Sequence, residues 1–95
     1  MNQYEGIIIF KGDLQDKQLE EECAKVEDLI KKHDGKIEKS ERWGKKALSY
    51  EIKKFRDGFF LYVFFEAMAE SIKPLTDVLR LDGNILRAQI LKKEK

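Results

Sequence analysis

The sequence of 95 residues predicts an α+β fold built from two successive strand–helix–strand units. Two segments carry apolar residues at helical spacing, and four segments are rich in β-branched and aromatic residues. Turn-forming residues separate these segments. We expect one domain, residues 1–95, because this length suits a single ordinary domain.

The first strand is expected over residues 4–10, YEGIIIF, which form a β-branched and aromatic run followed by a turn at Gly12 and Asp13. A helix is expected over residues 16–33, because apolar residues recur there every three or four positions. These residues are Leu19, Cys23, Val26 and Ile30. We expect Asp13 or Asp16 to cap the helix and Gly35 to end it in the left-handed conformation.

The second strand is expected over residues 37–52, with a break in its alternation. Apolar side chains occupy odd positions at Ile37 and Trp43, and even positions from Leu48 onward. An extra residue in a strand moves the following side chains to the opposite face, so we expect a β-bulge at Gly44.

The second half repeats the pattern. A polar turn is expected over residues 53–58, followed by a strand over 59–65 that is apolar on both faces and therefore central in the sheet. A helix is expected over residues 71–81, with Pro74 in its first turn and an apolar side formed by Ile72, Leu75, Val78 and Leu79. The last strand, residues 85–91, alternates apolar side chains with Arg87 and Gln89.

This βαββαβ order is the split β-α-β pattern of the ferredoxin-like fold. The fold has a four-stranded antiparallel sheet in the order 4-1-3-2, with two helices on one face. The other face is open and the long second strand lies at an edge, so we expect function at that face or edge. The fold hosts enzymes, regulatory domains and RNA binders, and does not by itself decide between them.

Charge is unevenly distributed along the chain. Residues 1–35 contain nine acids and five bases, whereas residues 36–95 contain nine acids and fourteen bases, including all four arginines. Guanidinium groups suit forked contacts to phosphate, which makes a polyanion partner plausible. No apolar run approaches the roughly 20 residues of a membrane helix, and the first residues do not resemble a secretory signal, so we expect a cytoplasmic protein without a membrane partner.

The sequence offers little for catalysis or metal binding. His33, the only histidine, is expected to cap the end of the first helix, and Cys23 to be a small core residue. The carboxylates Glu20 to Glu22, Glu27 and Asp28 are interpreted as a solvated helix face. We therefore predict no enzyme activity, no metal site and no cofactor.

Residues 56–64, RDGFFLYVF, partly match the third-strand signature of RNA-recognition motifs, a basic residue and glycine followed by aromatics that stack on bases. Phe60 stands where glycine or alanine is expected, and Leu61 replaces a stacking aromatic. Core packing explains this aromatic strand at least as well.

Over nearly its full length the chain resembles the family of bacterial small-subunit ribosomal protein six. The resemblance is carried by Tyr4 and Glu5, by Gly35 before Ile37, and by three longer markers. These are residues 41–50 (ERWGKKALSY), Gly58-Phe59, and residues 79–87 (LRLDGNILR). Ser49 and Glu51 replace the alanine and proline that usually flank the tyrosine, and a charge protects an edge strand as a proline does.

The resemblance implies a non-enzymatic ribosomal protein that binds the central domain of the small-subunit ribosomal RNA together with small-subunit ribosomal protein eighteen. We expect RNA to contact a cluster formed by Tyr4, Arg80, Arg87, Gln89 and Lys92, with phosphate contacts from the bases and stacking from the tyrosine. We assign the second strand to the partner protein, through Trp43, Lys45, Lys46, Leu48 and Tyr50. Core packing is the alternative for Trp43, and the favoured one for Leu48.

Two other classes stay open. A ligand-sensing regulatory domain of the same topology would bind a small molecule at the loop containing Gly12 and form a stable homodimer, whereas the ribosomal interpretation predicts a monomer in isolation. An RNA-recognition-motif protein would bind single strands without a partner and would depend on Phe59.

Overall fold

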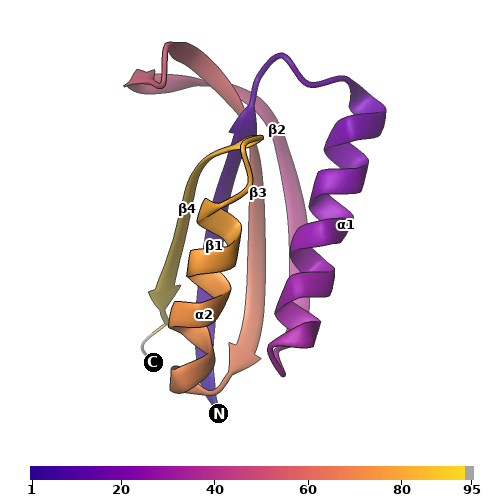
Figure 1. The fold of residues 1–95 in the computed structure, drawn as a ribbon, viewed down its shortest axis with the longest axis vertical. Helices are drawn as coiled ribbons and strands as arrows, with labels where there is room; N and C mark the ends of the chain where they lie inside the picture. Colours follow the sequence, from indigo (N-terminus) through magenta and orange to yellow (C-terminus); the bar gives the residue numbers. More distant parts are fainter. Residues whose placement is uncertain (94–95) are drawn as a thin grey trace.

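The computed structural model describes residues 1–93, which form a four-stranded sheet covered on one face by two helices (Figure 1). The elements are β1 (Asn2–Lys11), α1 (Asp16–Lys32), β2 (Lys36–Ile52), β3 (Phe55–Ala67), α2 (Ala69–Arg80) and β4 (Ile85–Lys92). The strands pair antiparallel in the order β2-β3-β1-β4. The predicted ferredoxin-like βαββαβ fold with strand order 4-1-3-2 is therefore confirmed.

The core lies between the sheet and the helices, and the alternation of β3 shows how it is filled. Leu61, Val63 and Phe65 are buried to 1% exposure or less, whereas Phe60, Tyr62 and Phe64 are half-buried on the open face. The helices contribute Cys23, Val26, Ile30, Leu75 and Leu79. Val78 was expected in this set, but it is 37% exposed because the buried stripe of α2 follows Leu75 and Leu79.

The ends of α1 differ from expectation. The residue preceding the helix is Gln15, whose backbone N–H donates to Oε1 of Gln18 at 3.2 Å, so neither Asp13 nor Asp16 is the cap. The left-handed residue at the other end is Asp34, with φ of 62°, rather than Gly35. Gly35 is required for another reason: a Cβ atom there would lie 2.8 Å from the carbonyl oxygen of Ile30.

Helix α2 begins at Ala69, two residues earlier than predicted. Pro74 consequently lies inside the helix and not in its first turn. Because proline lacks an N–H, the helical hydrogen bond to the carbonyl of Glu70 is missing. Leu75 and Leu79 compensate through burial, since each is 1% exposed.

The predicted bulge in β2 is present. Arg42 pairs with Leu61 and Gly44 with the next residue of β3, Phe60, so Trp43 is the extra residue. Gly44 has φ of 85°, a conformation that favours glycine. Two further irregularities, between Ile37 and Lys39 and between Ala47 and Ile52, were not predicted.

The β2–β3 hairpin is longer than predicted, because β3 begins at Phe55 and residues 55–58 belong to the strand instead of the turn. Lys53 and Lys54 alone connect Ile52 to its partner Phe55. We call residues 45–56 the arm. Figure 1 shows that the arm extends past the helices and bends toward the side of the sheet where β4 lies.

Candidate functional site

A groove runs between α2 and β4 and contains three of the five residues predicted to bind RNA. Arg80 at the end of α2 and Arg87 and Gln89 of β4 line it, together with Lys73 and Asp77 of α2. Lys73 and Asp77 form an ion pair at 3.7 Å, whereas Arg80 and Arg87 make no ion pair with any residue in 1–93. Two uncompensated guanidinium groups therefore make the groove attractive to an anion.

The structure places the other two predicted RNA contacts elsewhere. Tyr4 is only 6% exposed, and its ring stacks against Phe65 in the core at 5.8 Å between centroids. The predicted stacking of Tyr4 on RNA is therefore wrong for this fold. The alternation of side chains along the strand indicated this burial, because Tyr4 points to the same face as the buried Ile8 and Phe10. Lys92 is exposed at the end of β4, opposite Tyr4, and does not line the groove.

The residues assigned to a protein partner surround an aromatic stack on the open sheet face. The Trp43 ring lies parallel to that of Tyr62, with centroids 4.2 Å apart and planes within 5°. The ammonium of Lys46 lies 4.2 Å from the Trp43 centroid. Trp43 is 46% exposed, so it belongs to the surface and not to the helix-side core. Exposed aromatic side chains such as Trp43 are enriched in protein interfaces.

Three further residues of this assignment lie on the arm. Lys45 forms an ion pair with Asp57 at 3.7 Å, and Tyr50 is 62% exposed. Leu48 is half-buried but lies outside the cluster of buried core residues, so the favoured expectation that it packs in the core is wrong. The arm leaves the body of the sheet at this point, which removes the helices as packing partners.

One contact joins the two predicted surfaces. The guanidinium of Arg87 donates a hydrogen bond from Nη1 to the Tyr50 hydroxyl at 2.8 Å. These residues come from β4 and β2, the two edge strands of the sheet, and the bend of the arm brings them together (Figure 1). Sequence analysis missed this contact, because it treated the RNA and protein surfaces as separate edges.

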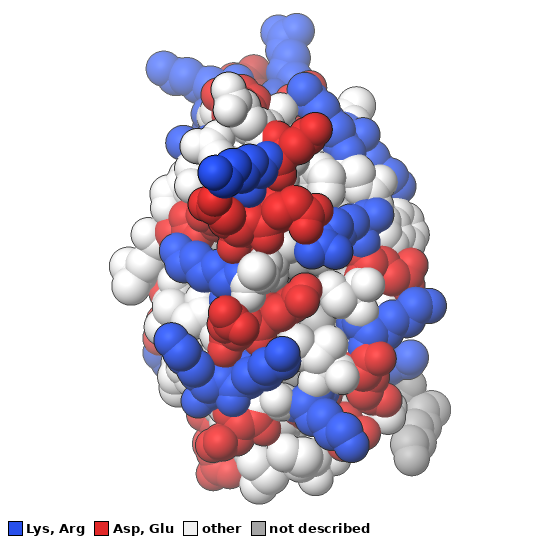
Figure 2. Space-filling view, turned by 90° about the vertical axis from the view of Figure 1, so that its right-hand side faces the viewer, with Lys and Arg blue, Asp and Glu red and all other residues white. Residues whose placement is uncertain are grey.

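Acidic side chains of α1 dock the helix onto the rest of the fold. Glu20 pairs with Arg42 at 3.2 Å, and Glu27 accepts a hydrogen bond from Ser40 at 3.3 Å. Figure 2 shows acidic and basic side chains interspersed over this side of the molecule. The interpretation of these carboxylates as a solvated face holds for Glu20, which is 65% exposed, but is wrong for the half-buried Glu22 and Glu27.

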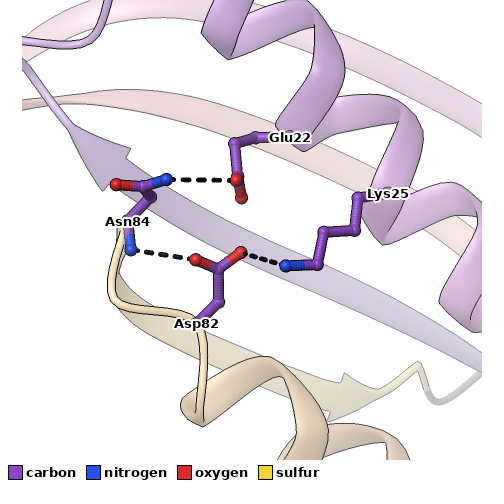
Figure 3. A network of polar contacts seen from close by, with 4 residues as sticks. All are labelled: Glu22, Lys25, Asp82 and Asn84. Atoms are coloured by element: carbon purple, nitrogen blue, oxygen red, sulfur yellow. Dashed lines mark hydrogen bonds and ion pairs between the residues drawn. The ribbon is translucent and has the colours of Figure 1, made fainter.

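Glu22 belongs to a polar network that ties α1 to the turn between α2 and β4 (Figure 3). Its Oε1 accepts a hydrogen bond from the Asn84 amide at 3.2 Å, and Asp82 accepts from the Asn84 backbone N–H at 2.9 Å. Asp82 also pairs with Lys25 at 3.1 Å. Oε2 of Glu22 is buried and has no hydrogen-bond partner among residues 1–93.

The two carboxyl groups of this network titrate in opposite directions. Burial, and then the neighbouring Asp82, raise the pKa of Glu22 above its ordinary value of 4.5. Burial also opposes ionisation of Asp82, but Glu22, the Asn84 N–H and Lys25 outweigh it and lower the pKa of Asp82 below 3.8. Glu22 is therefore the group that takes up the proton first, and Asp82 holds the charge that pairs with Lys25.

Glu22→Gln is expected to stabilise the protein at pH 7 by about 1 kcal/mol, because a neutral amide can donate to Asp82 without a buried charge. Because folding raises the pKa of Glu22, the wild type loses stability as pH rises above 4.5 and Glu22 ionises. At pH 4 Glu22 is mostly protonated and neutral, so the advantage of the variant should shrink there. Urea unfolding of both proteins at the two pH values measures this. An equal or lower stability of the variant at pH 7 would contradict it.

The remaining candidates have structural roles. Nδ1 of His33 lies 2.8 Å from the carbonyl oxygen of Leu29, which confirms its place at the helix end. Cys23 is fully buried as predicted, and burial raises the pKa of its thiol. The carboxylate of Asp57 lies against Gly12, so it occupies the space next to the glycine where the regulatory-domain alternative expects a ligand.

The RNA-recognition-motif alternative loses two of its aromatic positions on β3, although Phe60 and Phe64 are half-buried on the open face. Phe59, a position of the matching signature, packs against the helix-side core. On the open face, Trp43 covers the ring of Tyr62. A base would have to displace Trp43 to stack there.

Comparison with known proteins decides the family. Residues 3–92 match the family model described as Ribosomal protein S6. The chain belongs to the ribosomal protein S6 family. The small ribosomal subunit protein bS6 of Carboxydothermus hydrogenoformans is 30% identical over 95 residues, which are 100% of this chain and 99% of that protein. The bS6 protein of Geobacter sulfurreducens is 40% identical over 92 residues, covering 97% and 79% of the two chains.

Solved structures agree with this family. The crystal structure of 30S ribosomal protein S6 from Thermotoga maritima matches with a TM-score of 0.92 at 28% identity, covering 97% of this chain and 87% of that one. The C-terminal domain of the MgtC protein from Mycobacterium tuberculosis shares the fold at 9% identity and a TM-score of 0.65. Two differently named proteins on one architecture illustrate why the fold alone does not define the function.

Membership in the S6 family confirms several predictions. The chain is a structural, non-enzymatic protein of the small ribosomal subunit, and the bacterial ribosome is its location. Within residues 1–93, no helix is long and apolar enough to cross a membrane.

Proposed function

We propose that this S6-family protein binds the central domain of the small-subunit ribosomal RNA together with small-subunit ribosomal protein eighteen. RNA occupies the groove between α2 and β4, and the partner protein covers the open sheet face around Trp43. The observation that carries this proposal is the hydrogen bond between Arg87 and Tyr50, since it makes the two surfaces contiguous.

The groove has the chemistry of a phosphate site. Arg80 and Arg87 are exposed and keep their charge uncompensated among residues 1–93, because the only side-chain partner of Arg87 is a neutral phenol. Gln89 adds an amide that both donates and accepts. Contacts of this kind set the position of the RNA backbone more than they read its sequence.

The open sheet face has the chemistry of a protein contact. The Trp43–Tyr62 stack is a rigid apolar surface, and Lys45 and Lys46 supply charge at its margin. A tryptophan that is half exposed in the isolated chain gains favourable burial when a partner covers it.

The overall charge favours joint over independent binding. Sequence-independent affinity for RNA rises with the number of phosphates that a protein neutralises. With a formal net charge of +1, this chain alone neutralises few of them. A basic partner on the adjacent face supplies the missing charge. In isolation the protein is a monomer under this proposal, and sedimentation that shows a stable homodimer would favour the regulatory-domain alternative.

The test is a titration of a central-domain ribosomal RNA fragment with the full chain, at fixed salt, with and without protein eighteen. We expect tight binding only when protein eighteen is present. Independent tight binding by the chain would favour the RNA-recognition-motif class. No binding in either mixture would refute the proposal.

A further inference from the structure

The turn at the tip of the arm has an unusual composition for its geometry. Lys53 and Lys54 have φ angles of 49° and 72°, so two consecutive lysines adopt the left-handed conformation. A two-residue hairpin turn with both φ angles positive favours Asn-Gly, because other side chains clash with the backbone there. The lysines therefore destabilise the turn, which points to a role for their charge.

The arm is strongly basic. Residues 45–56 contain five bases and one acid. Lys45 is paired with Asp57, and Lys46 lies over Trp43. The other three bases, Lys53, Lys54 and Arg56, are exposed and form no ion pair with any residue in 1–93. Of the five bases of the arm, these three have neither an ion pair nor an aromatic contact among residues 1–93.

The arm is held against the body of the protein. Tyr50 accepts the hydrogen bond from Arg87 at 2.8 Å, and the ammonium of Lys11 lies 5.9 Å from the centroid of the Phe55 ring. Tyr50, three residues before the turn, therefore fixes the arm to Arg87 of the groove. The uppermost side chains in Figure 2 are basic, and the arm occupies the same end of the molecule in Figure 1.

We infer that Lys53, Lys54 and Arg56 form a second phosphate-binding site, which contacts the backbone of the RNA bound in the groove. This inference rests on the proposed function and extends it from one RNA contact to two. Each lysine ammonium offers three donors to phosphodiester oxygens, and Arg56 offers a planar fork. An acidic protein segment would suit the same charges, but the contact of the arm with Arg87 of the groove favours RNA.

The test replaces Lys53→Asn together with Lys54→Gly in the full chain. This pair removes both charges and installs the residues that the turn geometry favours, so folding is preserved and thermal stability should stay equal or rise. In the titration with protein eighteen and the central-domain RNA fragment, we expect affinity to fall about tenfold at ~0.15 M salt. The slope of log affinity against log salt should decrease by about 2, one for each lost phosphate contact.

The matched control is Lys31→Gln with Lys32→Gln, which removes two adjacent charges at the end of α1 opposite the arm in Figure 1. It should bind RNA as the wild type does. If the wild type binds and the turn variant keeps its affinity and salt slope, the inference is wrong and the proposed function stands. An equal loss in the control, or weaker binding to protein eighteen without RNA, would also overturn the inference. If the wild type binds no RNA at all, both fail.

Discussion

Trp43→Ala is expected to weaken binding of protein eighteen by about 30-fold, which corresponds to about 2 kcal/mol. Trp43 is the largest exposed side chain of the open sheet face assigned to the partner, and Tyr62 holds its ring at 4.2 Å in a single orientation. A rigid aromatic loses little conformational entropy on binding. Calorimetric titration of the variant and the wild type with protein eighteen measures the difference.

Protein stability should respond much less than partner binding. The stack with Tyr62 contributes about 1 kcal/mol, and nearly half of the Trp43 side chain is already exposed, at 46%. Trp43→Phe should restore most of the binding, since it keeps a stacked ring. Leu81→Ala removes a side chain that is 84% exposed at the end of α2 and serves as the control. An unfolded Trp43→Ala variant, or one with unchanged partner binding, would contradict the assignment.

Replacing Arg80 and Arg87 together with glutamine is expected to weaken RNA binding by about 100-fold in the presence of protein eighteen. Each arginine loses a charged hydrogen bond worth about 1.5 kcal/mol, and two such losses correspond to about 100-fold in affinity. Unfolding free energy should change by less than about 0.5 kcal/mol per site, since both side chains are exposed. The RNA titration and a urea unfolding curve test the two parts.

A conservative variant and a control separate the effect of the positive charge from that of the guanidinium shape. Arg87→Lys keeps the positive charge but loses the planar fork, so it should retain the salt dependence and lose part of the affinity. Lys17→Gln with Lys32→Gln removes two charges from α1 and should leave RNA binding unchanged. RNA binding that survives the double arginine replacement would exclude the groove as the main contact.

The hydrogen bond between Arg87 and Tyr50 gives the two proposed interfaces a physical link. Arg87 lies in the groove and Tyr50 on the arm, so RNA in the groove and protein on the arm meet at one contact. Cooperative binding of RNA and partner protein follows if each ligand favours the same position of the arm. The basic turn of the arm, Lys53 and Lys54, lies close to this junction in the chain.

Local patterns in the sequence determined the fold of this protein. The period-two and helical repeats predicted the order of the six elements, and the change of parity between Trp43 and Leu48 predicted the bulge at Gly44. These features depend on residues close in sequence, which is why they could be read without coordinates. The same parity rule would have placed Tyr4 in the core had it been applied to the first strand.

The functional surfaces were decided by the tertiary structure. Trp43 and Tyr62 lie on paired strands, but their parallel stacking depends on the bulge geometry. Arg87 and Tyr50 are 37 residues apart on opposite edge strands, and Glu22 meets Asn84 across 62 residues. No local periodicity encodes such contacts. They arise from the twist of the sheet and the bend of the arm, which are properties of the assembled fold.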